Sequence, residues 1–437
     1  MENANSLFHP WMKQNDFQGK KITDADGIYI WIDGKKCFDM ASQSINVNIG
    51  HRNSEVIRAI QEQCEKLPYI YSGFSNPIMD EAARDVLGVL PNIYKKVYFT
   101  NSGSEANENA IKLARMYTGK QKIFSSYNSY HGSTIGAGNL TGDQRRLACE
   151  PGQVGFIKFN FPDKYHSKGQ FRSDKEMSNF YLDLLREQII DEGQNNIAAI
   201  FLEPIIGGNG VIIPPDNYLE GIREICNEFK ILMVCDEVMT GWGRTGKWFA
   251  FEHWDIKPDI ITTSKGMTSS YVAFGVVVVN EHIAKYFDNH VLMCGSTNYA
   301  HLLGCAATVA SIKVYKKLNL IENSELLGKL LNVELNKMKS KYHSIGDIRC
   351  KGLFAAIEFK DNVMGKRDSV NIAYLINLLE EKGFWTLGRR NILMIAPPLI
   401  INREQLLESL NILDSVLEDL YMKGSKPKLA VDESIRA

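Results

Sequence analysis

The sequence lacks long uncharged apolar runs, a charge excess of either sign and a leader-like start. The nearest approach to an apolar span, residues 272–279, is far shorter than a membrane-crossing helix. The net charge is −1 with both signs interspersed, which argues against binding to nucleic acid or to an anionic membrane. Residues 1–6 contain neither a basic segment nor an apolar core, so no signal peptide is expected.

The eight cysteines are scattered and show neither CxxC nor CxxH spacing. Several lie in apolar runs, such as Cys235, where a cysteine behaves as a small buried hydrophobe. This pattern predicts a reducing compartment, no structural zinc and a cytoplasmic protein. With 44% apolar and 23% charged residues the composition is that of an ordinary globular chain, which excludes disordered and fibrous classes.

Short apolar runs alternate with helical patterns between about residues 96 and 280. The runs lack polar alternation, as expected of strands that are covered on both faces in a mainly parallel sheet. Residues 218–229 between two of them have the apolar spacing of an amphipathic helix. The alternation predicts an α/β layered domain. The runs are 97–99, 122–124, 198–202, 231–234, 260–261 and 276–279.

The two ends of the chain have a different pattern. Residues 320–343 predict a long amphipathic helix, 352–359 and 392–395 are strand-like, and 403–421 predict a closing helix. Residues 27–33 alternate like a hairpin strand. The chain of 437 residues is long enough for more than one domain. We therefore expect a large domain over 53–314 and a smaller α+β domain formed by 1–52 and 315–437. The tail 423–437 has little to bury and is expected to fray.

Ligands of open parallel sheets bind beyond the carboxyl ends of the strands, so the residues that follow each run are informative. After 97–99 comes Ser102-Gly103-Ser104-Glu105 and then a helix pattern. Ser102 and Glu105 have the spacing of a capping box, and free N–H groups at a helix start bind anions. An ordinary capped helix explains the same residues.

Three further strand ends carry chemically useful side chains. Tyr130 and His131 offer aromatic rings that could cover a planar ligand, although packing explains such a pair equally well. Asp236 ends a buried run, where its carboxylate needs a partner: a helix cap, Arg244 or a protonated pyridine nitrogen. Lys265 follows the next run, where desolvation would lower its pKa and make its amine nucleophilic toward an aldehyde.

An anion cradle, an aromatic plate, a carboxylate and an amine together match the needs of pyridoxal phosphate. That cofactor needs a phosphate site, a stacking ring, a pyridinium partner and a Schiff-base lysine. A surface position is the commoner explanation of a single lysine, and the four features together make the cofactor site the stronger one.

These residues resemble the class III aminotransferases, which are fold-type-I pyridoxal-phosphate enzymes that handle ω-amino groups. The resemblance extends over nearly the whole chain, from residue 33 to the final helix. Residues 41–51 and 384–391 are most similar to the taurine and ω-amino-acid branch. The other segments that carry it are 99–107, 130–132, 202–204, 236–238, 243–246, 264–266 and 295–297.

The resemblance implies a role for each matched residue. Lys265 would hold the cofactor and move the proton, and Asp236 would keep the pyridine nitrogen protonated. Val238 would pack on the ring face opposite Tyr130. The implied phosphate and ring contacts further include Ser102, Gly103, Ser104, His131, Gly132 and, from the neighbouring subunit of a homodimer or larger assembly, Thr297.

Substrate residues depart from the family pattern. Met239 stands where a glutamine is common, and Met394 stands where many members carry an arginine that clamps a carboxylate. Glu203, which pairs with that arginine in those members, has lost its partner. Arg390 or Arg389 could substitute, although two exposed loop arginines are the commoner explanation. An apolar Met394 suits a donor without an α-carboxylate.

By resemblance, the reaction is a ping-pong transfer of an amino group from a taurine- or β-alanine-like amine to a 2-oxo acid such as pyruvate or 2-oxoglutarate. Related enzymes with this cofactor act as racemases or epimerases, mutases or decarboxylases, and sequence does not report which bond at Cα is broken. A binding protein without catalysis on the same fold is a third reading, disfavoured by the intact Lys265 and Asp236. No metal is expected.

Overall fold

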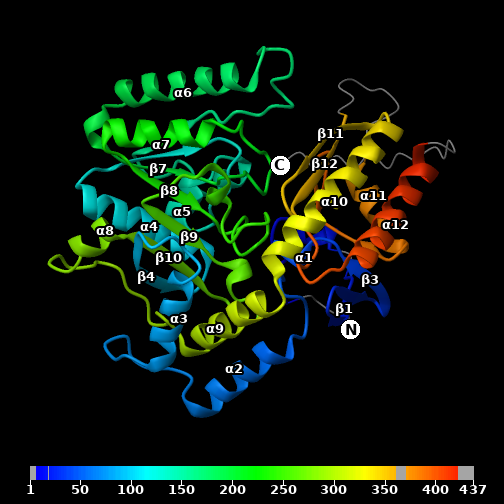
Figure 1. Ribbon diagram of the computed structural model, residues 1–437, viewed down its shortest axis with the longest axis horizontal. Coiled ribbons are helices and arrows are strands. Elements are labelled where there is room, and N and C mark those ends of the chain that lie inside the picture. The colour runs from blue at the N-terminus through cyan, green and yellow to red at the C-terminus, as the bar shows by residue number, and fades with distance from the viewer. Residues whose placement is uncertain (1–5, 18, 361–370, 422–437) are drawn as a thin grey trace.

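A computed structural model describes residues 6–17, 19–360 and 371–421 of the chain. The described chain forms a seven-stranded sheet and two four-stranded sheets, with helices packed around them (Figure 1). The mixed α/β architecture with a parallel-rich central sheet confirms the predicted fold class. Among the described residues, no helix combines the length and apolarity that crossing a membrane requires.

The large sheet has the strand order β4-β10-β9-β8-β7-β5-β6. All neighbours pair in parallel except β10, which is antiparallel to both β4 and β9. Residues 264–274 are too few for a parallel crossover with a helix, so the chain reverses into β10. The strands are β4 (Tyr94–Thr100), β5 (Lys122–Ser126), β6 (Phe156–Phe159), β7 (Ile197–Leu202), β8 (Leu232–Asp236), β9 (Ile260–Thr263) and β10 (Gly275–Asn280).

Helices cover both faces of this sheet, which explains the absence of polar alternation in its strands. In β7, Ile200 packs in the core cluster that contains Ile222 of α7, whereas Phe201 packs in the cluster that contains Ala110 of α4. Alternate residues of one strand therefore serve opposite layers. The helices around the sheet are α2 (Ser54–Lys66), α3 (Pro77–Leu87), α4 (Gly103–Thr118), α5 (Ile135–Leu140), α6 (Asp174–Asp191), α7 (Tyr218–Phe229), α8 (Glu281–Tyr286) and α9 (Leu302–Lys317).

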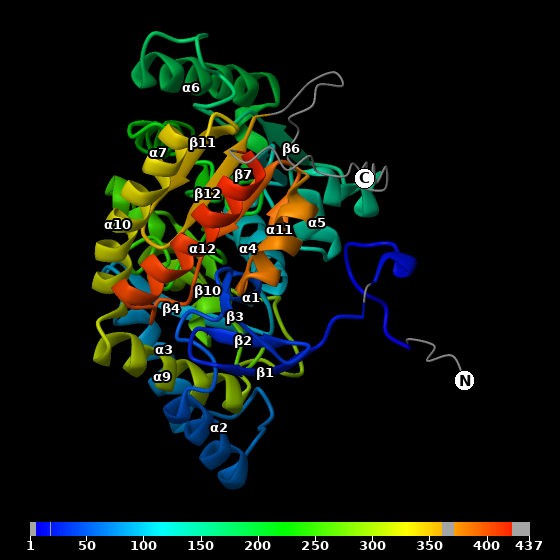
Figure 2. The ribbon, with the colours of Figure 1, turned by 90° about the vertical axis from the view of Figure 1, so that its right-hand side faces the viewer.

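The N-terminal strands and the late helices and strands lie together beside the large sheet, as the blue and the orange to red ribbons show in Figures 1 and 2. Phe384 pairs in parallel with Phe38, which joins a late segment to the N-terminal sheet. The division at residues 52 and 314 stays a prediction, and the tail 423–437 lies outside the described residues. These elements are β1 (Ile22–Asp26), β2 (Tyr29–Ile32), β3 (Lys35–Asp39), α1 (Ser42–Ile45), α10 (Leu320–Lys341), β11 (Ile345–Cys350), β12 (Ala355–Phe359), α11 (Ile372–Glu381), β13 (Phe384–Trp385), β14 (Gly388–Arg389), β15 (Ile392–Ile395) and α12 (Arg403–Tyr421).

Arg244 ties the large sheet to both terminal segments. Its side chain is fully buried and donates to the carbonyl oxygens of Leu353 and Pro397 at 2.9 and 2.6 Å. It also donates to Ser42 Oγ at 3.2 Å and to Asn48 Oδ1 at 2.8 Å. Burial lowers the pKa of this guanidinium to about 10. One planar fork therefore satisfies acceptors from three distant parts of the chain.

We expect Arg244→Lys to lower the free energy of unfolding by about 3 kcal/mol, because one ammonium cannot reach all four acceptors and the rest stay buried and unsatisfied. Urea denaturation followed by circular dichroism measures the change. The control is Arg186→Lys on α6, where the arginine pairs with Asp183 and Glu228 at the surface and the expected change is within about 0.5 kcal/mol. Equal stability of the two variants would contradict this role for Arg244.

Candidate active site

The carboxyl ends of β7, β8 and β9 are aligned at one edge of the large sheet. The pairing of β7 with β8 runs to Leu202, and that of β8 with β9 runs to Asp236. Glu203 follows β7 directly, and Lys265 lies just beyond β9. The register therefore brings the predicted carboxylate and amine to the edge where parallel sheets bind their ligands.

Lys265 opens a short 3-10 helix (Lys265–Met267) with a φ of +40°, a left-handed value that non-glycine residues adopt at a cost. Desolvation lowers the pKa of its amine to about 8. The carboxylates of Glu203 and Asp236 oppose this shift, while the positive charge of Arg145 adds to it. The amine is thus closer to its neutral, nucleophilic form at neutral pH than an ordinary lysine.

Asp236 is 3% exposed and has three partners. Its Oδ2 accepts from Asn107 Nδ2 at 2.8 Å and lies 2.8 Å from His131 Nδ1, and its Oδ1 accepts from the Val238 N–H at 2.9 Å. A carboxylate has about four acceptor positions, so about one remains for a further donor. Arg244, the alternative partner suggested by the sequence, donates elsewhere, and that alternative is wrong.

The predicted anion cradle is the N-terminal turn of the sixteen-residue helix α4. Ser102 Oγ accepts from the Glu105 N–H at 3.1 Å, which is half of the expected capping box. The other half is shifted, because Glu105 Oε2 accepts from the N–H of Asn101 at 2.8 Å rather than from Ser102. The N–H groups of the first helical turn, which include those of Gly103 and Ser104, have no intrahelical acceptor.

Glycine at position 103 lets this helix end approach the end of β8. A Cβ added to Gly103 would lie 2.8 Å from Val238 Cγ2, closer than side chains tolerate. The cradle and Val238 therefore line the same space, on the side where Asp236 presents its carboxylate. This proximity is not visible in the sequence, because β4 and β8 are not neighbours in the sheet.

The segment of Tyr130, His131 and Gly132 lies between the carboxylates and the cradle. The Tyr130 N–H donates to Glu203 Oε1 at 2.9 Å, and buried His131 faces Asp236. Gly132 has a φ of +138°, and a Cβ there would collide with the side chain of Ser104. A glycine is therefore required at position 132 for the backbone to pass this close to Ser104.

Thr297 is exposed in the single chain, in the connection between α8 and α9. The preceding residue, Ser296, accepts a hydrogen bond through its Oγ from Asn101 Nδ2 at 3.3 Å. Asn101 immediately precedes the cradle, so this hydrogen bond holds the loop of Thr297 next to the cradle. Transfer of Thr297 to a neighbouring subunit stays a prediction.

Glu203 is 4% exposed and has backbone partners in place of an arginine. Besides the Tyr130 N–H it accepts from the Gly207 N–H at 2.9 Å through Oε2. Desolvation raises the pKa of this carboxyl group to about 7. Met239 packs against Gly207, and Met394 is buried in β15, where it offers no polar group.

Two arginines meet at Asp143, and of these sequence reasoning named only Arg389, as an alternative to Arg390. Arg145 and Arg389 share the buried carboxylate of Asp143, with contacts of 2.6 and 2.9 Å. Arg390, the other predicted candidate, is exposed in the turn between β14 and β15, and no ion pair among the described residues includes it, so its substrate role stays a prediction. In the sequence, Arg145 is marked only by its position two residues after Asp143, and that spacing is too common to single it out.

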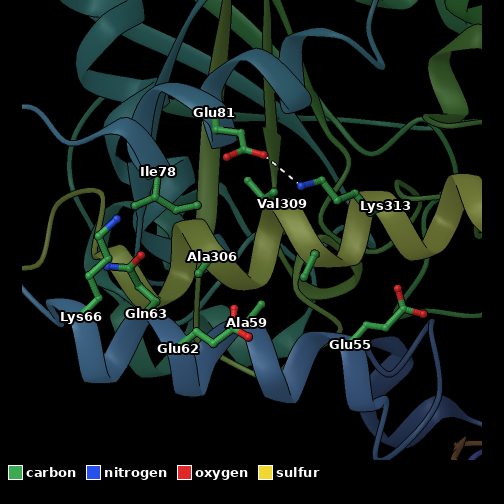
Figure 3. Close-up of a pocket in the computed structure, with 11 residues that line it drawn as sticks. Glu55, Ala59, Glu62, Gln63, Lys66, Ile78, Glu81, Ala306, Val309 and Lys313 are labelled. Carbon is green, nitrogen blue, oxygen red and sulfur yellow. Dashed lines mark hydrogen bonds and ion pairs between the residues drawn. The ribbon is translucent and has the colours of Figure 1, made fainter.

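A separate hollow lies among three helices. It is bounded by α2, α3 and α9, where Glu81 pairs with Lys313 at 3.0 Å (Figure 3). Its lining includes none of the predicted cofactor or substrate residues. The residues around Lys265 are therefore the candidate active site.

Comparison with known proteins places this arrangement in a family. The model of the aminotransferase class-III family matches residues 13–417. A taurine–pyruvate aminotransferase of Bilophila wadsworthia is 34% identical over 78% of this chain and 76% of its own. A leucine/methionine racemase of Thermococcus litoralis is 34% identical over 90% of this chain and 89% of its own.

A solved structure is similar over the same extent. The taurine:2-oxoglutarate aminotransferase of Bifidobacterium kashiwanohense, in complex with pyridoxal phosphate and glutamate, is 42% identical with a TM-score of 0.90. The match covers 94% of this chain and 95% of that one. The chain belongs to the class-III aminotransferase family, and it is a pyridoxal-phosphate-dependent transaminase of fold type I.

The side chains present fit that cofactor. The cradle requires glycine at position 103, the Asp236 carboxylate has one acceptor position left, and the Lys265 amine has a lowered pKa at the same edge. An anion, a ring N–H and an aldehyde are the groups that these three features bind.

We expect the Lys265 amine of the cofactor-free protein to titrate near pH 8, below the usual value of about 10.4, because desolvation favours the neutral form. Reductive methylation with carbon-13 followed by NMR reports each lysine as a function of pH. One signal should titrate near pH 8 in the wild type and be absent from Lys265→Ala. If the signal lost in that variant titrates with the surface lysines, the amine is not desolvated.

Proposed function

We propose that the chain transfers amino groups from an ω-amino acid or primary amine of the taurine or β-alanine type to a 2-oxo acid, such as pyruvate or 2-oxoglutarate, in a ping-pong reaction. The observation that carries this proposal is the aligned edge that bears Asp236, Lys265 and the cradle. The donor class rests on the 42% identity to a taurine:2-oxoglutarate aminotransferase and on methionine at position 394.

Pyridoxal phosphate, when bound, supplies an aldehyde and an electron-withdrawing ring. Ser102, Gly103 and Ser104 would hold its phosphate through the N-terminal turn of α4. Asp236 would favour a protonated ring nitrogen, and Asn107 and His131 hold that carboxylate in place at 2.8 Å each. Val238 and Tyr130 would hold the ring between them.

Lys265 carries the proton in this proposal. Its amine would hold the cofactor covalently, and the same amine would be the base that accepts and returns the proton of the reaction. A pKa of about 8 is close to neutral pH, so the same amine can both accept and return a proton, which suits this role.

Racemisation is the second candidate, because a leucine/methionine racemase is 34% identical over 405 residues. A racemase needs a substrate with a hydrogen on a chiral Cα and returns the amino group to it. Taurine and β-alanine have no such centre, so the two reactions are separable by the fate of the amino group.

We further propose a homodimer, with Thr297 reaching the phosphate of the partner's site. Support comes from two loops that expose large apolar side chains, which marks protein interfaces. Tyr71 and Phe74 between α2 and α3 are 66% and 69% exposed, and Val291 and Met293 between α8 and α9 are 77% and 72% exposed. The second loop also contains Thr297.

A reducing, cytoplasmic location is proposed as well. All eight cysteines have free thiols in the structure, which suits a compartment where thiols stay reduced.

We expect taurine, added without acceptor, to convert the visible absorption band of the bound cofactor to that of its pyridoxamine form, and pyruvate or 2-oxoglutarate to restore it. Lys265→Ala should lose this half-reaction, and Asp236→Asn should slow it by about two orders of magnitude or more, because an unprotonated ring nitrogen withdraws electrons poorly. Proton exchange at Cα of leucine without any pyridoxamine form would instead favour the racemase.

Mixing of two inactive variants tests the location of Thr297. Thr297→Asp places a negative charge against the phosphate, and Lys265→Ala removes the amine. If Thr297 crosses the interface, a mixed dimer has one site with both intact residues, so co-expression should restore about a quarter of the wild-type activity when subunits pair at random. Absence of activity in purified mixed dimers would show that Thr297 acts within its own chain.

A further inference from the structure

Asp143 holds two arginines beside the candidate active site. Arg145, in the 3-10 helix Gln144–Cys149, donates to it from Nε at 3.0 and 3.1 Å and from Nη2 at 2.6 Å. Arg389 of β14 donates from Nη1 at 2.9 Å. One carboxylate, 4% exposed, therefore balances two positive charges, and the cluster keeps an excess of about one. Desolvation would raise the pKa of Asp143, but the hydrogen bonds and charge of Arg145, with a hydrogen bond from Asn209, lower it to about 2.

The cluster of Asp143, Arg145 and Arg389 contacts Tyr130 through Arg145. The Arg145 guanidinium lies 3.7 Å from the centre of the Tyr130 ring, and Trp11 lies at the edge of the same ring. The Tyr130 N–H is bound to Glu203 at the strand edge that carries the site. Arg145 is close enough to Lys265 for its charge to lower the pKa of that amine. Arg145 is thus near the reacting amine, and Arg389 shares its carboxylate partner.

Both guanidinium groups have donors to spare. Arginine has five N–H donors, and among the described residues Arg145 engages only Nε and Nη2 and Arg389 only Nη1. Their side chains are 24% and 31% exposed, so a ligand can reach them. Support of the Tyr130 ring would explain Arg145 alone. It would not explain a second arginine, brought from β14 to the same carboxylate.

We propose that Arg145, with Arg389 beside it, binds the oxyanion group of the substrate, a sulfonate or a carboxylate, at the end remote from the reacting amino group. This assignment rests on the proposed function. Paired N–H donors of arginine match the oxygens of such groups, and Asp143 holds the fork in position without neutralising it fully. The pair does the task for which Met394 has no polar group.

Binding of amine-free anions to the holoenzyme tests the proposal. Ethanesulfonate stands for the donor and propanoate for the 2-oxo acid, and neither can react. By isothermal calorimetry we expect Arg145→Gln to weaken binding of at least one of them about tenfold or more, and Arg145→Lys to weaken it less. Arg146→Gln is the matched control, because it removes one positive charge from the same 3-10 helix, where Arg146 pairs with Glu150.

The anion whose binding is weakened shows which substrate the two arginines bind. A loss for ethanesulfonate assigns the pair to the donor, a loss for propanoate assigns it to the acceptor, and a loss for both assigns it to both. Wild-type affinity of Arg145→Gln for both anions, or an equal loss in Arg146→Gln, would overturn the proposal. The visible cofactor band should be unchanged in Arg145→Gln, which shows an intact site. If the wild type binds the anions but no amine reduces its cofactor, the proposed function fails while the anion site stands.

Discussion

A buried carboxylate organises the functional edge of this molecule. Asp236 is 3% exposed, and an ionised carboxylate in such a place is costly unless donors surround it. Its donors come from separate elements: Asn107 from the middle of the first half of α4, His131 from the segment after β5, and the backbone of Val238 from the turn after β8. Satisfying one side chain therefore requires that the helix bearing the anion cradle and the segment bearing Tyr130 meet at β8.

Burial and neighbouring charges act in opposite directions on the pKa of Lys265, the amine near that carboxylate. Glu203 and Asp236 are negative neighbours of Lys265, yet burial still lowers the pKa of the amine to about 8. Desolvation thus outweighs the two attractions, because an ammonium loses more by leaving water than two partly engaged carboxylates return. Glu203 is itself pushed to a pKa of about 7. The amine of Lys265 and the carboxyl group of Glu203 therefore both have pKa values near neutral pH.

The late part of the chain completes the site from the other side. The strands β14 and β15 place Arg389 against Asp143 and bury Met394. Their position relative to the large sheet depends on contacts such as those of Arg244, which reaches Pro397 and Leu353 from the loop after β8. The predicted cofactor residues belong to the large sheet and the segments around it, whereas Arg389 and Met394 belong to β14 and β15.

The sequence by itself determined the layers and the cofactor. Fully apolar runs predicted buried parallel strands, and Ser102, Tyr130, Asp236 and Lys265 were visible because each follows such a run, where position along the chain already implies the edge of the sheet. Only the tertiary structure decided which residues from distant parts of the chain contact one another. It showed that β10 runs antiparallel, that Arg244 serves backbone carbonyls rather than Asp236, and that Arg145 and Arg389 share one carboxylate across 244 residues of chain. Such pairings depend on where distant segments come to rest, and no local periodicity encodes that.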